Sequence, residues 1–91
     1  MENVLDLFQT TEEKMLDISS KIRETRKSRG ISQELLATMS NVSFGSIKRF
    51  ERTGEISLYS LLKLTNALKI KISFVNEYDV KSAKLGFYNE K

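Results

Sequence analysis

The sequence predicts an all-α bundle of four to five helices, followed by a short C-terminal β-strand. Three serines, Ser32, Ser43 and Ser57, stand where helix N-caps are expected, because a serine oxygen can accept from the unsatisfied amides of a first turn. Each serine follows an apolar residue that can meet a second apolar residue five positions further on, which is a hydrophobic staple. After residue 69 the apolar pattern changes from helical to alternating, which predicts a strand.

The composition limits the functions that are open to the chain. Ninety-one residues make one domain, and 40% hydrophobic with 30% charged residues fit neither a disordered nor a membrane protein. Cysteine and histidine are absent, which removes most zinc sites, the commonest nucleophiles and the commonest general base. We therefore expect no enzyme, no metal site and no cofactor. Without a membrane-length apolar run or a signal-peptide pattern, a cytoplasmic protein is expected.

The first long helix is predicted over about residues 11–28, after an N-terminal extension of residues 1–10. Thr10 and Glu13 have the spacing of a capping box, which marks the start of this helix. Within the extension, residues 2–9 are expected to form a helical turn or two. Three apolar residues of the long helix recur at helical spacing and should face the core: Met15, Ile18 and Ile22.

Two short helices are predicted next, over about residues 32–39 and 43–52. The distance between their starts leaves room for two turns of helix and a tight bend, which is the geometry of a helix-turn-helix. The second short helix is followed by Gly54, which suits a left-handed C-terminal cap. The residues of this pair that we expect in the core are Leu35 or Leu36, Ala37, Ile47 and Phe50.

A further helix begins at Ser57, and the predicted strand covers residues 70–74. A lone strand leaves its backbone groups unpaired, so it needs a partner. That partner is either residues 78–88, folded back on the strand, or a second chain. The alternative is a helix end that trails into a flexible tail. The apolar face of the last helix is formed by Leu58, Leu61, Leu62, Leu64 and Leu68.

The net charge of +3 is unevenly distributed along the chain. Residues 1–20 carry five acids and one lysine, a balance of −4, whereas residues 21–54 carry eight basic groups and three acids, a balance of +5. Residues 55–91 hold six lysines and four acids, a balance of +2. Positive charge is therefore concentrated at the short helices, which favours phosphate contact over the alternative of a merely solvated face.

From about residue 22 to residue 70 the chain resembles the lambda repressor/Cro-type (XRE-like) helix-turn-helix family. The resemblance implies a lambda repressor-like fold and a bacterial or phage DNA-binding regulator, usually dimeric, that binds double-stranded DNA and is associated with the nucleoid. The last predicted helix contributes the family-like pattern Ser-Leu-x-x-Leu-Leu-Lys-Leu-x-x-Ala-Leu. Outside that helix, the resemblance depends on Arg26, Ser32, Gln33, Ala37, Val42, Ser43, Ile47, Arg49, Glu51, Arg52 and Gly54.

Four residues are expected to support the helix pair, namely Ala37, Asn41, Ile47 and Glu51. Ala37 is small enough for the two short helices to cross closely. Asn41 replaces the family's usual glycine in the turn, and asparagine tolerates positive φ better than other side chains. The resemblance also implies a buried ion pair in which Glu51 orients Arg26 toward a phosphate. An ordinary surface pair, worth less than about 1 kcal/mol, is the alternative.

The helix over residues 43–52 is the predicted reader of DNA sequence, because the first turn of such a helix reaches base edges in the major groove. Phe44 offers apolar contact to a thymine methyl group, or else packs against Met39 or a neighbouring turn. Gln33 begins the preceding helix, where it meets a phosphate or is simply a polar first residue. The predicted DNA-binding residues are Arg26, Gln33, Ser43, Phe44, Gly45, Ser46, Lys48, Arg49 and Arg52.

The sequence thus predicts a transcriptional repressor that binds a near-palindromic operator as a homodimer. Residues 11–69 form the DNA-binding domain, and residues 70–91 serve dimerisation or partner binding. The alternative is the antitoxin of a toxin–antitoxin operon, which binds DNA through the same domain and a toxin through the C-terminal segment. A third class, a structural module without DNA binding, requires the basic face to be incidental.

Overall fold

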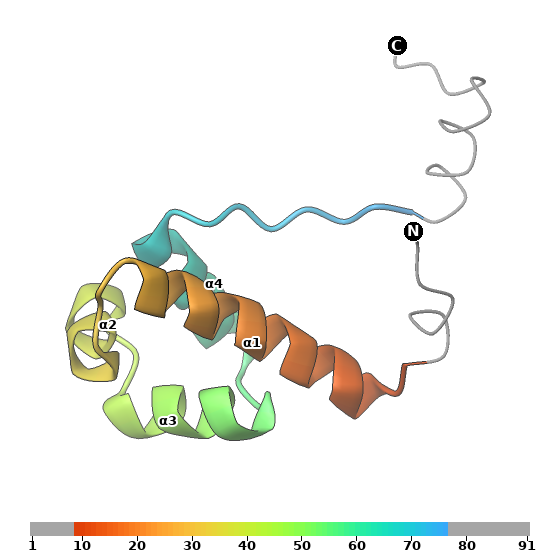
Figure 1. Ribbon diagram of the computed structural model, residues 1–91, viewed down its shortest axis with the longest axis horizontal. Helices are drawn as coiled ribbons and strands as arrows, with labels where there is room; N and C mark the ends of the chain where they lie inside the picture. The colour runs from red at the N-terminus through yellow and green to blue at the C-terminus, as the bar shows by residue number, and fades with distance from the viewer. Residues whose placement is uncertain (1–8, 77–91) are drawn as a thin grey trace, which may run out of the picture.

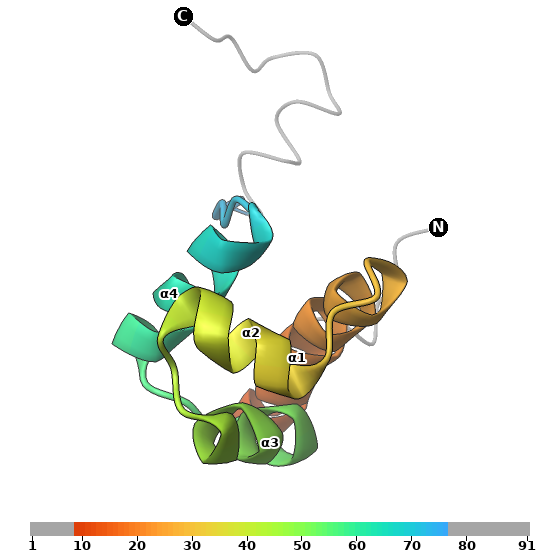
Figure 2. The same cartoon turned by 90° about the vertical axis from the view of Figure 1, so that its left-hand side faces the viewer.

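The computed structural model describes residues 9–76, which form a bundle of four helices without a strand (Figure 1). Helices α1 and α2 each pack against both α3 and α4. The two views show α1 crossing the bundle, with α2 beside its C-terminal end (Figures 1 and 2). The all-α fold class is confirmed. The helices are α1 (Thr11–Ser28), α2 (Gln33–Ser40), α3 (Phe44–Thr53) and α4 (Leu58–Leu68).

Every helix begins after a residue whose hydroxyl oxygen caps its first turn. At α1, Thr10 accepts from the Glu13 amide at 3.1 Å and Glu13 accepts from the Thr10 amide at 2.9 Å, which completes the predicted capping box. Ser32, Ser43 and Ser57 each accept from the amide three residues later, at 2.9, 3.1 and 3.0 Å. The predicted starts are confirmed, with each serine standing as the cap one residue before its helix.

All four helices and the α2–α3 turn contribute to one core. The apolar partners of the three predicted staples all belong to this core or pack against it. Of the two leucines considered for α2, Leu36 is buried and Leu35 is exposed. The buried apolar residues are Ile22, Leu36, Val42, Ile47, Phe50, Leu64 and Leu68, and Ile31, Ala37, Ile56, Leu61, Ala67 and Ile70 pack against them.

The prediction that Ile18 faces the core was wrong, since its side chain is 44% exposed. The buried stripe of α1 passes through Ser19, Ile22 and Arg26, so Ile18 lies at the edge of that stripe. The Ser19 hydroxyl is satisfied within the helix, because it donates to the Leu16 carbonyl at 2.9 Å. The small polar residue Ser19 is therefore buried in place of Ile18, its apolar neighbour.

The apolar face of α4 is narrower than predicted, since Leu58 is 69% and Leu62 is 43% exposed. Both leucines lie beside the buried stripe that ends in Leu64 and Leu68. Leu58 is the first residue of α4, directly after the loop that joins α3 to α4, and its side chain is open to solvent.

After α4 the chain runs in an extended conformation from residue 70 to residue 76 (Figure 1). Lys69 ends the helix in the left-handed region at φ 59°, and the Ile70 amide donates back to the Thr65 carbonyl at 2.8 Å. Residues 70–74 pair with no strand in the described part of the chain, and Phe74 is 95% exposed. The strand over residues 70–74 stays a prediction, while residues 78–88 and almost all of the predicted turns over residues 2–9 lie outside the described residues.

Candidate nucleic-acid interface

Helix α3 has one face in the core and the opposite face in solvent. Ile47 and Phe50 are 0% and 1% exposed, which confirms the predicted buried side. The remaining face is polar or basic, apart from one aromatic residue. The exposed residues of α3 that were predicted to bind DNA are Phe44, Gly45, Ser46, Lys48, Arg49 and Arg52.

The turn before α3 is built around a left-handed asparagine. Asn41 has φ 59° and ψ 33°, as predicted, and its amide donates to the Ala37 carbonyl at 2.9 Å. Its own carbonyl accepts from the Lys63 ammonium group on α4 at 3.1 Å. Ala37 packs against the core beneath this turn. The chain therefore enters α3 through a turn that is bonded to both neighbouring helices.

The C-terminal end of α3 lies directly on α1. Gly54 caps the helix at φ 83°, and its amide donates to the Phe50 carbonyl at 2.7 Å. A Cβ atom at this position would lie 2.8 Å from the Met15 carbonyl carbon and 2.9 Å from the Met15 Cβ. Glycine is thus required by the left-handed conformation and by the close approach of the two backbones.

A buried ion pair joins α1 to α3. Arg26 donates through Nε and Nη2 to the two carboxylate oxygens of Glu51, at 2.8 and 2.9 Å, and the two side chains are only 10% and 5% exposed. Gln33 at the start of α2 donates from Nε2 to the same carboxylate at 2.9 Å. The bidentate geometry fixes three helices around one carboxylate. The buried pair implied by the family resemblance is confirmed.

Arg26 is bonded within the protein through three of its five N–H groups. Besides the two bonds to Glu51, Nη1 donates to the Ile31 carbonyl at 2.8 Å. A phosphate contact would have to use the second hydrogens of Nη1 and Nη2, and it stays a prediction. Gln33 is half-buried and keeps a second amide N–H, so a phosphate contact remains open to it.

The exposed basic residues of α3 differ in their surroundings. The Lys48 ammonium group lies 5.1 Å from the centre of the Phe44 ring, one turn earlier, in a cation–π contact. Arg49 forms an ion pair with Glu55, in the loop that follows the helix. At the start of the helix, the Ser43 hydroxyl accepts from the Ser46 amide and donates to the Ser46 hydroxyl. Both bonds lie within the first turn, so Ser43 acts in the structure as the N-cap of α3.

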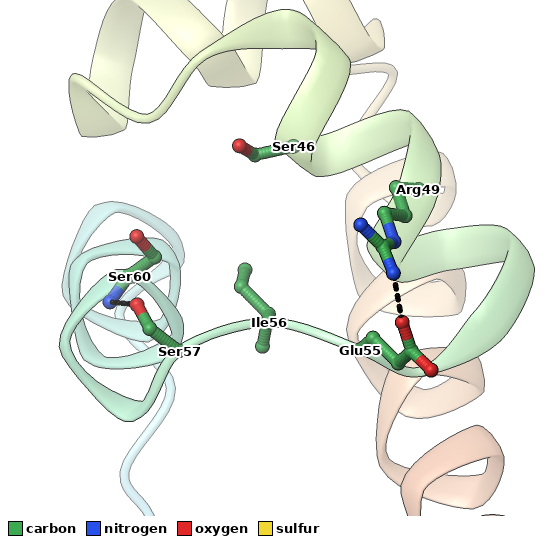
Figure 3. A pocket seen from close by; sticks show the side chains of 6 residues that line it. All are labelled: Ser46, Arg49, Glu55, Ile56, Ser57 and Ser60. Atoms are coloured by element: carbon green, nitrogen blue, oxygen red, sulfur yellow. Dashed lines mark hydrogen bonds and ion pairs between the residues drawn. The ribbon is translucent and has the colours of Figure 1, made fainter.

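An open pocket of about 340 Å³ separates the exposed face of α3 from the start of α4 (Figure 3). Only two of the predicted DNA-binding residues, Ser46 and Arg49, line it. Glu55 also lines it, and nothing in the local sequence pattern shows that the Glu55 carboxylate turns back toward α3. The other lining residues are Ile56, Ser57 and Ser60.

Among residues 9–76 there is no group of three or more acidic, histidine or cysteine residues that would hold a metal ion. None of the helices described there combines the length and the apolar character that crossing a membrane requires.

Comparison with known families identifies the family that has this arrangement of helices. The model of a helix-turn-helix family, of the XRE/lambda repressor-like type, matches residues 22–75, which is more than half of the chain. The match begins within α1, includes the α2–α3 pair and α4, and ends in the extended segment. No curated protein and no solved structure matches the chain. The protein belongs to the XRE/lambda repressor-like helix-turn-helix family of DNA-binding transcription regulators.

Proposed function

We propose that the protein is a repressor that binds a near-palindromic operator as a homodimer. Each protomer would insert its α3 into one of two successive major grooves, about 34 Å apart, and the bound dimer would exclude other proteins from the site. The observation that supports the proposal is the face of α3, where three cations and the residues of the first turn are exposed above a buried apolar side.

The proposed contacts divide into those that read bases and those that bind the backbone. The first turn of α3 reaches base edges, with the Phe44 ring against a thymine methyl group and no side chain at Gly45 to hinder close approach. The cations farther along the helix contact guanine or phosphate oxygens. Residues of the proposed interface are Gln33, Ser43, Phe44, Gly45, Ser46, Lys48, Arg49 and Arg52.

The salt dependence of DNA binding tests this assignment. An operator is first selected from a random duplex pool, and binding is measured over a salt series for Lys48→Ala and Arg49→Ala. Each substitution should weaken binding by at least about tenfold, and each lost phosphate contact should lower the salt slope by about 1. Lys21→Ala on α1 is the matched control. Unchanged affinity and slope for both α3 substitutions would refute the assigned face.

The extended segment supports the dimer part of the proposal. Two copies of residues 70–74, paired antiparallel about Ile72, set Ile70 opposite Phe74 and Lys71 opposite Ser73. This register avoids like charges directly across the pair and gathers the apolar side chains on one face. It also satisfies the backbone groups that lack a strand partner within the described chain.

The same segment favours one second candidate, an antitoxin. Ile72, Phe74 and Val75 are exposed by 39%, 95% and 69%, and such a segment suits strand addition to a different protein. Purification from the native host distinguishes the two functions. A stoichiometric second protein that is lost with Phe74→Lys supports the antitoxin, whereas a pure homodimer supports the free-standing repressor.

A further inference from the structure

One acidic side chain stands beside the exposed basic face of α3. Within α3 and the loop that follows it there are two carboxylates, of which Glu51 is buried in the pair with Arg26. The other, Glu55, has a side chain that is 53% exposed and forms an ion pair with Arg49, whose side chain is 63% exposed. Figure 3 shows the Arg49 side chain directed along the helix to meet this carboxylate at the rim of the pocket.

The bond to Glu55 uses one N–H of the Arg49 guanidinium and leaves the others available. It is donated by Nη2, so the second Nη2 hydrogen and those of Nε and Nη1 are not engaged by Glu55. That second Nη2 hydrogen shares an edge of the group with a hydrogen of either Nε or Nη1. A guanidinium held by Glu55 therefore still presents one edge with two donors, which suits a bidentate contact with the O6 and N7 atoms of guanine.

The carboxylate has a second effect, which is on phosphate contacts. Binding to DNA of arbitrary sequence depends almost entirely on neutralised phosphates. While Arg49 is paired, its charge is already compensated by Glu55, so neutralising a phosphate requires the pair to break and leaves the phosphate near an unpaired carboxylate. An exposed ion pair is worth no more than about 1 kcal/mol, so the pair can be broken, but the cost applies to every non-operator sequence.

We propose that Glu55 is a specificity-determining positioning residue, which holds Arg49 for a base contact and keeps it from the DNA backbone. This inference rests on the proposed operator binding. Glu55 itself makes no contact with DNA in this proposal. The effect of Glu55 is to lower the affinity of the protein for arbitrary duplexes more than its affinity for the operator.

The test compares Glu55→Gln with the unaltered protein on two duplexes, the selected operator and a scrambled duplex of the same length. We expect Glu55→Gln to bind the scrambled duplex about fivefold more tightly, the factor that corresponds to the upper limit of an exposed ion pair. The salt slope on that duplex should rise by about 1, because Arg49 then neutralises a phosphate. Affinity for the operator should rise less or fall, so the ratio of the two affinities decreases.

A matched control separates positioning from net charge. Asp17→Asn removes the same unit of charge and breaks an equally exposed pair, Asp17 with Lys21 at 3.0 Å on α1. It should leave the ratio of affinities unchanged. If Asp17→Asn lowers the ratio as much as Glu55→Gln does, the effect is general electrostatics and the inference is overturned.

A double substitution tests whether Glu55 acts through Arg49. In the background of Arg49→Met, Glu55→Gln should no longer raise the salt slope on the scrambled duplex. A slope that still rises would overturn the inference, while the proposed repressor function would stand. If the unaltered protein shows no salt-dependent binding to any duplex, the proposed function and the inference fail together. Circular dichroism of each variant verifies that the helices are retained.

Discussion

Two glycines of this chain occupy opposite situations. Gly54 lies in the left-handed region with α1 backbone atoms in the space where a Cβ would be. Gly45 lies in the first turn of α3, with nothing within 4 Å of the corresponding Cβ position. The first glycine is needed for packing and conformation, whereas the second is needed for neither. A requirement for glycine at position 45 would therefore have to come from a ligand.

Alanine at these two positions should have effects of opposite sign on stability. Gly54→Ala should lower the free energy of unfolding by about 2 kcal/mol or more, since it strains φ and forces α1 from α3. Gly45→Ala should raise it by about 0.5 kcal/mol, because alanine is the better helix former. Urea unfolding followed by circular dichroism measures both. A neutral Gly54→Ala would contradict the close approach described between the two backbones.

The residues that the sequence predicted well are those governed by short-range rules. The capping serines, the left-handed Asn41 and Gly54 follow from hydrogen bonds that span only a few residues. Contacts between distant residues were not predictable in this way. Lys63 bonds the carbonyl of Asn41, and Arg29 bonds the carbonyl of Leu68 at the end of α4. Pattern alone does not show which surface cation lies near which free carbonyl.

At the scale of elements, three helices meet at a single carboxylate. Glu51 on α3 accepts from Arg26 on α1 and from Gln33 on α2, and little of the group is open to water. The pair fixes the angle at which α3 stands relative to the two helices behind it. Because its charges are removed from solvent, loss of either partner leaves the other without compensation.

Removing the charge of Glu51 should therefore be costly. Glu51→Gln should lower the free energy of unfolding by about 3 kcal/mol, because the Arg26 guanidinium remains buried without a counter-charge. Asp17→Asn breaks an exposed pair on α1 and should cost less than about 1 kcal/mol. Chemical unfolding of both variants gives the comparison. Equal effects for the two would mean that the Glu51 carboxylate is solvated in solution.

The apolar period predicted the helices better than it predicted their buried faces. Periodicity locates an apolar stripe along each helix, but the tertiary arrangement decides which part of that stripe the neighbouring helices cover. Ile18, Leu58 and Leu62 fit the period and are nevertheless exposed, since the stripes of α1 and α4 pass beside them. The division of α3 between core and solvent was more predictable, because Ile47 and Phe50 share one side of the helix and both are buried.

At the scale of the whole molecule, the extended segment would link two domains into a dimer. The side chain of Phe74 contributes nothing to the described monomer, as it is 95% exposed. Phe74→Lys should therefore shift the dimer toward monomer without loss of helix content, by placing a charge in the apolar face of the paired strands. Sedimentation equilibrium measures the shift, with Phe74→Leu as the control that keeps the apolar side chain. A dimer of unchanged affinity would exclude this interface.

Helix α3 is held by only three residues on the α2 side and four on the α4 side, and each connection contains one left-handed residue. A rod fixed so closely at both ends has little freedom to adjust its curvature or tilt to a target. Any bending that an operator complex needs must then come from the duplex itself. Base pairs that no side chain touches would affect affinity through their stiffness, which flexible and rigid central steps in otherwise identical operators would reveal.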